Sequence, residues 1–134
     1  MAKESGMGMS AAIDDSGGTA RTISNDITNI DWANPRGVQD VTGLDKSAME
    51  RLLLLADFSV NVNGVFNDAS NTSHDVFKTV TSSSVARTVT LAISGQTLPN
   101  ECFFTDYSLT RGTDGSMTYT APGALTGGAV PTWA

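Results

Sequence analysis

The sequence predicts a mainly β domain, built as a β-sandwich or flattened barrel of about six to eight strands with one flanking α-helix. Stretches in which apolar and polar residues alternate are separated by turns rich in Gly, Asn and Asp, as in antiparallel sheets. Within residues 41–66 the apolar spacing changes from that of a helix to that of a strand. The 134 residues suit a single domain, 1–134, with one core.

The helix is expected at about residues 45–56, because apolar side chains recur there at spacings of three and four. Asp45 suits the N-cap, and Ser47 followed by Glu50 offers a second capping register, so two start points remain open. The residues expected on its buried face are Ala48, Met49, Leu52, Leu53 and Ala56. A helix this short needs a sheet to pack on.

A strand is expected directly after this helix, at residues 58–66. Phe58, Val60 and Val62 alternate with small polar residues, which predicts one buried and one solvated face. Gly64 interrupts the alternation and predicts a bend or bulge. We expect Phe58, Val60 and Val62 to share the core with the helix.

The rest of the chain is expected to supply the other strands, a short helix at 74–79 and two arms. Asn34-Pro35 ends the second strand, and residues 35–44 are expected to form a loop into the helix. Residues 1–8 and 122–134 have few apolar positions and are expected to be flexible arms that, with the polar loop 67–84, order when subunits meet. The other expected strands are 9–13, 19–32, 85–94, 100–111 and 116–121.

The charge balance disfavours stable binding to nucleic acid or to an anionic membrane. Lys and Arg number 8 and Asp and Glu 14, for a net charge of −6, whereas phosphate binding needs clustered cations. Only 16% of residues are charged, so we expect neighbours to cover much of the surface. The single cysteine excludes an internal disulfide and suits synthesis in a reducing cytoplasm. The chain shows neither a signal-peptide pattern nor an apolar run of membrane-spanning length.

The residues that carry catalytic chemistry in other proteins are better explained by packing. His74 is the only histidine and follows a polar loop, where an exposed or helix-capping role is favoured over a metal site or a Ser-His-Asp triad. Cys102 begins an apolar stretch and is expected to be buried and inert. We predict no catalytic, cofactor or metal site.

Two further patterns also have simpler readings. Asp14-Asp15 lacks the ligand rhythm of a calcium loop and indicates a turn, and the scattered glycines match no nucleotide-binding motif. Trp32, Tyr119 and Trp133 would form a sugar-binding platform only if they met on one face, and packing is favoured.

Two consecutive segments resemble the tail tube, or major tail, proteins of long-tailed bacteriophages. They are D-V-T-G-L-D-K-S-A-M-E-R-L-L-L-L-A-D-F-S-V-N-V-N-G-V-F at 40–66 and N-D-A-S-N-T-S-H-D-V-F-K at 67–78. The order of elements over about residues 9–121 is also similar: a hairpin, a D-V-T loop, a helix, a strand ending in Gly, a polar loop with a small helix, and three strands. The chain lacks a long insertion beyond 67–84.

The resemblance implies a structural virion protein whose subunits form hexameric rings that stack into a hollow tail tube. Duplex DNA would pass through the lumen without specific binding, and we expect a neutral to acidic lumen wall. The tape measure, tail terminator and distal tail proteins are the implied partners, and the phage tail is the implied location. Candidate subunit contacts are Met7, Met9, His74, Phe77, Val130 and Trp133.

The alternative is a carbohydrate- or partner-binding β-sandwich module, such as a capsid decoration or a tail-fibre-associated domain. Electron microscopy separates the two, because rings or tubes favour the first and a glycan-binding monomer favours the second.

Overall fold

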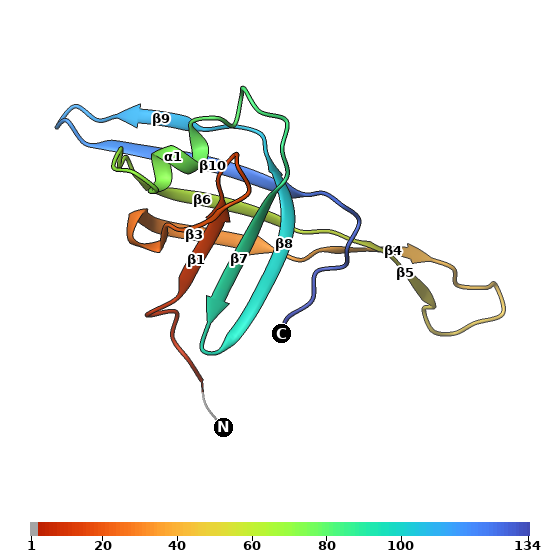
Figure 1. Ribbon diagram of the computed structural model, residues 1–134. Helices are drawn as coiled ribbons and strands as arrows, with labels where there is room; N and C mark the ends of the chain where they lie inside the picture. The colour runs from red at the N-terminus through yellow and green to blue at the C-terminus, as the bar shows by residue number, and fades with distance from the viewer. Residues whose placement is uncertain (1–2) are drawn as a thin grey trace.

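The computed structural model describes residues 3–134, which form ten strands, one 3-10 turn and one short α-helix (Figure 1). The strands are β1 (Ser10–Asp14), β2 (Ala20–Thr22), β3 (Ile27–Ala33), β4 (Arg36–Asp40), β5 (Arg51–Ala56), β6 (Ser59–Val65), β7 (Arg87–Ile93), β8 (Gln96–Phe104), β9 (Ser108–Arg111) and β10 (Met117–Leu125). The 3-10 turn η1 is Ser24–Asp26 and the helix α1 is Ser73–Phe77. The predicted mainly β class is confirmed.

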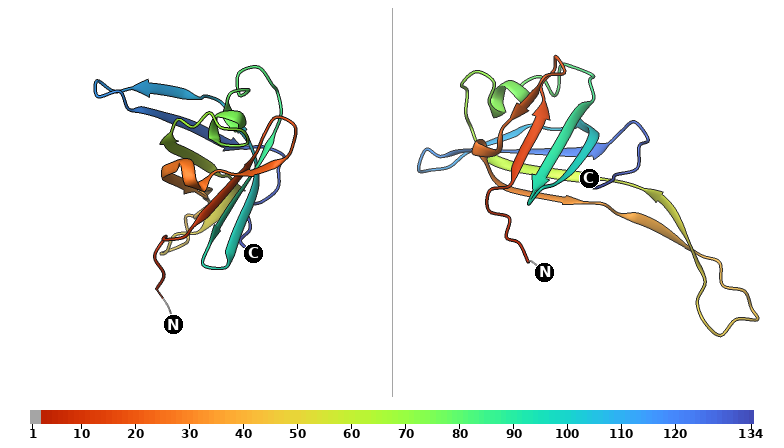
Figure 2. Two further views of the ribbon diagram at one scale, coloured as in Figure 1. Left: turned by 60° about the vertical axis from the view of Figure 1, so that its left-hand side comes forward. Right: turned by 60° about the horizontal axis from the view of Figure 1, so that its bottom comes forward.

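Eight strands form one antiparallel sheet in the order β2-β1-β7-β8-β10-β6-β3, with β9 also paired to β10. The sheet folds over itself where β8 meets β10, because these two strands pair only at Cys102–Phe104 with Gly123–Leu125. Figures 1 and 2 show the result: the layer of β1, β7 and β8 crosses the layer of β9, β10, β6 and β3.

The core lies between these two layers and is built from alternate residues of the strands. Leu91 of β7 faces Leu98 of β8, and both are buried. The opposite layer contributes Val60 and Val62 of β6 and Tyr119 of β10, which are also buried. Phe58, just before β6, has no exposed surface.

Helix α1 closes one end of the space between the layers. Phe77 is fully buried, and its ring lies 5.2 Å from that of Phe104 and 5.5 Å from that of Tyr119. Asp26, itself buried, accepts hydrogen bonds from the backbone N–H of Ser73 and from Asn67 Nδ2. The helix is thus held by side chains of this chain alone. The expectation that loop 67–84 orders on assembly stays a prediction, and its α1 portion already has packing partners within the single chain.

The predicted helix at about 45–56 is wrong. Arg51–Ala56 forms β5, which pairs with β4 in a separate two-stranded sheet, so residues 35–44 are also not a simple loop. Glu50, expected in a helix cap, instead donates its N–H to Thr42 Oγ1 at 2.8 Å across the base of the connecting loop. The apolar spacing of three and four residues, which predicted the helix, is ambiguous here because four leucines in a row satisfy both helical and strand periodicity.

The residues expected on the buried face of that helix are all outside the core. Leu52 and Leu53 are exposed, as are Ala48 and Met49 in the loop before β5. Residues 51–56 form a strand because β4 follows β3 and β5 leads into β6. The hairpin pairing of β3 with β6 therefore continues as the pairing of β4 with β5. Asp57 N–H donates to Pro35 O at 2.9 Å at the junction. A short helix there would have no sheet face to cover.

Two other boundaries differ from the expectations. The expected strand 100–111 is two strands, because the chain leaves β8 after Phe104 and re-enters the sheet as β9. The expected C-terminal arm begins inside β10, which extends to Leu125. Its end also returns to the sheet, because Ala134 and Thr97 exchange two backbone hydrogen bonds of 2.8 and 2.9 Å. Residues 1 and 2 of the expected N-terminal arm lie outside the described residues.

Candidate assembly surfaces

His74 performs a packing role on α1. Its ring stacks on Phe66 with centroids 4.9 Å apart, and its Nδ1 lies 3.1 Å from Tyr107 Oη. Within residues 3–134, no group of three or more His, Cys, Asp or Glu side chains is placed to hold a metal ion. The residue is half-buried, so only part of it is open to a neighbouring molecule.

Cys102 is buried on β8 among core side chains. Burial, reinforced by the nearby charge of Glu101, raises the pKa of its thiol to about 12. Since the thiolate is the nucleophilic form of cysteine, Cys102 is inert at neutral pH.

The acidic turn at Asp14-Asp15 is occupied by its own chain. Asp15 Oδ1 accepts the N–H groups of Gly17 and Thr19 at 2.9 and 3.1 Å, and Oδ2 pairs with Arg21 Nε at 3.1 Å. The bond from Thr19 is the main cause of the lowered pKa of the Asp15 carboxyl. These contacts explain the turn without a cation.

The proposed aromatic platform does not form. Tyr119 is buried beneath α1, so it cannot present its ring to a ligand beside Trp32 and Trp133. These three residues therefore give the carbohydrate-binding alternative no support. Among residues 3–134 no helix is long and apolar enough to span a bilayer.

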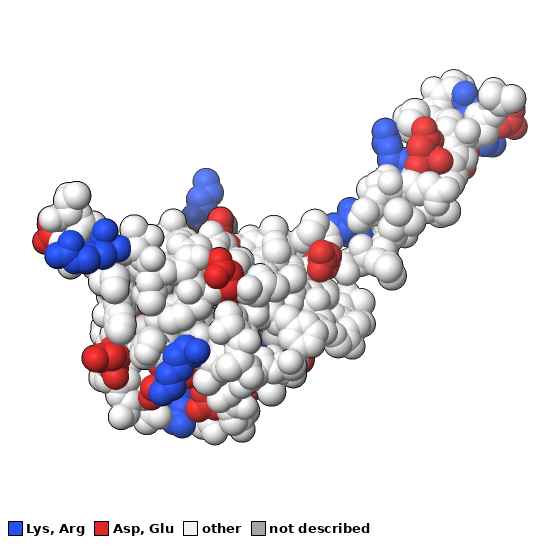
Figure 3. Space-filling view, turned by 90° about the horizontal axis from the view of Figure 1, so that it is seen from above, with Lys and Arg blue, Asp and Glu red and all other residues white. Residues whose placement is uncertain are grey.

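The most unusual surface is a projecting hairpin, residues 36–56, here called the apolar ribbon. It comprises β4, β5 and the loop between them, and it extends well away from the two layers (Figure 2). In Figure 3 it appears as an arm with long uncharged stretches and charges gathered near its far end. Its exposed large apolar side chains are Val38, Val41, Leu44, Met49, Leu52, Leu53, Leu54 and Leu55.

Both faces of the apolar ribbon are apolar. Residues opposite one another on antiparallel strands share a face, so Leu53 lies with Val38. Leu54 lies on the other face, because a Cβ built on Gly37 would be 3.3 Å from Leu54 Cβ. Strands with apolar residues on both faces are normally covered on both sides. Within residues 3–134 of a single chain, no other part of the molecule covers either face of the ribbon.

Burying these side chains would be strongly favourable. A fully buried leucine contributes about 1.5–3 kcal/mol relative to an exposed one, and contiguous exposed apolar patches on soluble proteins mark interaction sites. Both outer edges of the ribbon also carry backbone groups that β4 and β5 leave unpaired, a template for another chain. The ribbon is therefore a candidate assembly surface.

A second surface is the outer side of the layer β9-β10-β6-β3, here called the hydroxyl–amide face. The register places Thr118 opposite Thr110 and Thr120 opposite Asn63, and Thr120 Oγ1 donates to Asn63 Oδ1 at 2.8 Å. Its polar members are Asn29, Asp31, Ser59, Asn61, Asn63, Ser108, Thr110, Thr118 and Thr120, and the same register places Ala33, Val65, Pro122 and Ala124 on this face as well. Asp31 is the only charged one among them.

The end strands of this layer are also open. In the part of the chain that the structure describes, β9 pairs only with β10 and β3 pairs only with β6 within the main sheet. Each therefore has one edge available to a neighbouring subunit.

The predicted contact residues are scattered over the molecule. Met7, Val130 and Trp133 are exposed, Met9 and His74 are half-buried, and Phe77 is wholly buried in the core. Phe77 is thus unsuited to a subunit contact in this conformation. The sequence reasoning missed the apolar ribbon, although the run R-L-L-L-L-A without a polar alternate face was the pattern that could have indicated it.

Comparisons with known proteins identify the fold. No family model matches the sequence, and no curated protein does. Among solved structures, a chain in the tail of an empty gene transfer agent (GTA) particle with C6 symmetry matches with a TM-score of 0.78 and 18% identity over 98% of each chain. A chain in the virion of the native GTA particle matches with a TM-score of 0.77 and 18% identity, over 97% of this chain and 99% of that one.

Because both matches span nearly the whole of each chain, they concern the complete architecture and include the apolar ribbon. At 18% identity they show a common fold, which is that of a phage-like tail tube protein. The tail-tube-like fold predicted from the sequence is confirmed.

Proposed function

We propose that this chain is a structural virion protein that self-assembles into stacked hexameric rings, forming the hollow tail tube of a phage-like particle. The observation that carries the proposal is the apolar ribbon, which one chain leaves uncovered on both faces, on a fold shared with a chain of a C6-symmetric tail. The apolar side chains of such an arm are buried only in contact with another chain, which copies of the subunit can supply.

Ring formation is supported by the open edges of β9 and β3 at the two ends of one layer. Pairing β9 of one subunit with β3 of the next would join the layers into a continuous barrel. A barrel has no remaining edges, which removes the aggregation hazard of open strands. The contact is heterologous, and heterologous contacts close into rings when the rotation permits.

The hydroxyl–amide face would then line the lumen. Most of its side chains are small and polar, Val65 is an exposed apolar one, and Asp31 is its one charged residue, so it offers no cation to a passing phosphate backbone. DNA would move through the tube without specific binding. The tube would lie in the tail of the virion after synthesis in the host cytoplasm, and its ends would meet terminator and distal tail proteins, with a tape measure protein inside during assembly.

The test is negative-stain electron microscopy of the purified chain. We expect six-membered rings or tubes, because the open edges of β9 and β3 can pair between copies and the ribbon is left uncovered in one chain. A population that stays monomeric at every concentration and salt condition would contradict the proposal. Leu91→Asp, which disrupts the core, serves as a control for aggregates of unfolded protein.

A further inference from the structure

Strand β8 has a stretch of edge, residues 96–101, that no other strand covers. On one side β8 pairs with β7 along residues 96–102, whereas on the other side β10 reaches only residues 102–104. Pro99 lies in the middle of this stretch and has no N–H to donate, and Glu101 is its only charged residue. A strand edge of this kind is a template for pairing with another chain.

The chain covers this edge with its own residues 126–134, here called the strap. Where the strap begins, Thr126 donates its N–H to Glu101 O at 2.8 Å. At its other end, Thr97 donates its N–H to Ala134 O at 2.8 Å, and Ala134 donates its N–H to Thr97 O at 2.9 Å. In Figure 1 the strap runs back beside β8 from the end of β10. The edge of β8 therefore binds an extended segment through the same backbone groups that a further strand would use.

The strap is held by backbone hydrogen bonds and not by the core. None of its side chains is buried, and Val130 and Trp133 are exposed. Between its two ends the strap bows away from β8 and leaves a hollow of about 160 Å³, which Val130 lines from the strap. Gly127 and Gly128, with φ of 84° and 75°, lie in the left-handed region and turn the chain from β10 into the strap. The strap can therefore leave its place without unfolding the two layers.

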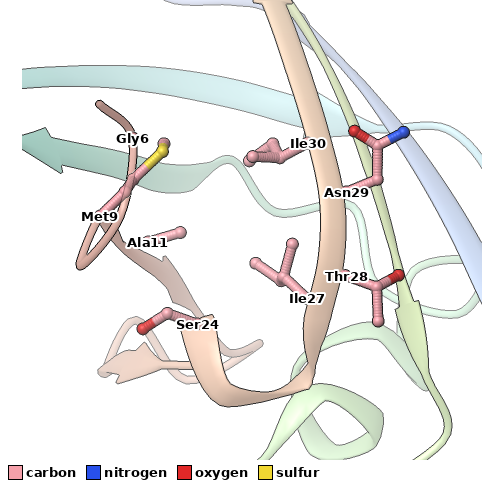
Figure 4. A pocket seen from close by; sticks show the side chains of 8 residues that line it. All are labelled: Gly6, Met9, Ala11, Ser24, Ile27, Thr28, Asn29 and Ile30. Carbon is pink, nitrogen blue, oxygen red and sulfur yellow. The ribbon is translucent and has the colours of Figure 1, made fainter. Parts of the chain in front are cut away.

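The hollow between the beginning of β1 and β3 offers no comparable guide to what binds there (Figure 4). Its lining mixes polar and apolar side chains, which include Ser24, Thr28, Asn29, Met9, Ile27 and Ile30. At the edge of β8, in contrast, the hydrogen bonds of the strap show which kind of group binds: the backbone of an extended segment.

We propose that the strap guards the edge of β8 in the free subunit and prevents a second copy of the chain from pairing with residues 97–101. Such pairing would join two subunits through a strand that takes no part in the proposed ring contact. With the strap in place, pairing between copies is left to edges that stay open, such as those of β9 and β3. This inference goes beyond the proposed function, because it concerns the subunit before assembly.

Proximity favours the strap over a second copy. The strap continues directly from β10, so its effective concentration at the edge of β8 is on the order of millimolar, as for a short linker. A second copy at micromolar concentration offers the same backbone groups at a roughly thousandfold lower concentration. Pro99 adds to the protection, because a proline on an edge strand removes one of the donors that a partner strand needs.

The test is sedimentation velocity over one dilution series, with chains that all carry Leu53→Asp so that the apolar ribbon contributes no contacts. The series includes concentrations at which the full-length Leu53→Asp chain is a monomer. The chain without residues 127–134 is expected to form dimers or larger oligomers at concentrations at least tenfold lower than any at which the full-length chain associates. Gly127→Val with Gly128→Val strains the turn but keeps the whole strap, and is expected to shift association in the same direction.

A charge placed on the edge of β8 provides the matched comparison. Thr97→Lys in the deleted chain is expected to restore the monomer, because a lysine on an edge strand disfavours pairing. Thr113→Lys adds the same charge in the exposed turn between β9 and β10 and is expected to leave the association of the deleted chain unchanged. Hydrogen exchange at the Thr97 amide should be slow in the full-length monomer and fast in the monomer with Gly127→Val and Gly128→Val.

A deleted chain that stays folded and monomeric over the whole series would overturn the guard role of the strap. Association that Thr97→Lys does not reduce would also overturn it, because the contact would then lie elsewhere. Loss of the folded state on deletion, measured by circular dichroism, would do the same, since the strap would then belong to the core. None of these results requires rings or tubes, so failure of the unmodified chain to assemble would contradict the proposed function alone.

Discussion

At the scale of single residues, the buried cation Arg87 ties three separate segments together. Its Nη1 donates to Asp14 O at 3.1 Å and to Val76 O at 2.8 Å, and Nη2 donates to Thr79 Oγ1 at 3.0 Å. The side chain is 2% exposed, so these bonds replace the water it has lost. It connects the β1 turn, α1 and the segment leading into β7.

We therefore expect Arg87→Met to destabilise the subunit by about 2–4 kcal/mol, because it removes the donor to the buried carbonyl of Val76 and to the part-buried carbonyl of Asp14. Urea unfolding of the free subunit measures the change. Arg51→Met, on the exposed ribbon, is the matched control and should shift the free energy of unfolding by less than about 0.5 kcal/mol. Equal changes in the free energy of unfolding for the two substitutions would show that the hydrogen bonds of Arg87 do not stabilise the subunit.

Position 64 is a second place where the fold requires a particular residue, because only glycine fits there. A Cβ at this position would lie 2.0 Å from Asp26 O and 2.8 Å from the Tyr119 ring. The register of β3 on β6 shifts between Ile27 and Asn29, next to the pairing of Ile27 with Gly64. The bend or bulge predicted at Gly64 thus corresponds to a close approach of η1 to the strand.

Gly64→Ala is expected to cost about 3 kcal/mol or more, since backbone and a buried aromatic ring would both have to move. Thermal melting of the subunit is the measurement. Gly17→Ala is a suitable control, because its added Cβ would meet only Asp15 Oδ1 at an ordinary 3.4 Å. A Gly64→Ala protein that melts with the wild type would disprove the close approach.

At the scale of elements, the apolar ribbon is expected to contribute to the assembly of subunits and little to the folding of the single chain. Its leucines are exposed in the single chain, so they contribute little to the stability of the subunit. We expect Leu53→Asp to leave the unfolding free energy within about 0.5 kcal/mol of wild type while abolishing rings and tubes. A buried helix at 45–56 would have given the opposite result.

Two measurements on the same sample check this expectation. Chemical unfolding reports the subunit, and sedimentation velocity reports the assembly. Leu91→Asp, placed in the core, should unfold the chain and provides the contrast. If Leu53→Asp also unfolds it, the ribbon belongs to the core after all.

At the scale of the whole molecule, the charge distribution suits a conduit. The chain has a net charge of −6, and the hydroxyl–amide face carries Asp31 as its only charged member. We expect assembled protein not to retain duplex DNA at physiological salt. Asn61→Lys with Thr120→Lys should introduce binding that weakens steeply as salt rises, because each phosphate contact releases counterions.

A gel-shift assay over a salt series tests this prediction. The same two charges placed at Ser82 and Ser84, exposed in the segment before β7, form the control and should bind DNA much less in the assembled state. Tight binding by the unmodified assembly, or equal binding by both variants, would contradict the assignment of this face to the lumen.

The sequence by itself determined the features that depend on local chemistry. Alternation predicts the strand that carries Val60 and Val62, with Phe58 just before it. Alternation and turn residues indicate a mainly β chain, and the composition indicates an acidic balance. The tail-tube-like fold was implied by the resemblance of residues 40–78 to tail tube proteins, although the helix expected within them is a strand. Periodicity and turn preferences act over a few residues, so they can be read from the chain directly.

Only the tertiary structure decided the conformation of residues 36–56. R-L-L-L-L-A fits a helix face and a two-sided strand equally well, and the choice falls to the strand because β3 and β6 extend their pairing into β4 and β5. Phe77 entered the core and Leu52 left it for the same reason: burial depends on which segments meet across the fold. Those long-range contacts have no local periodicity from which a sequence could predict them.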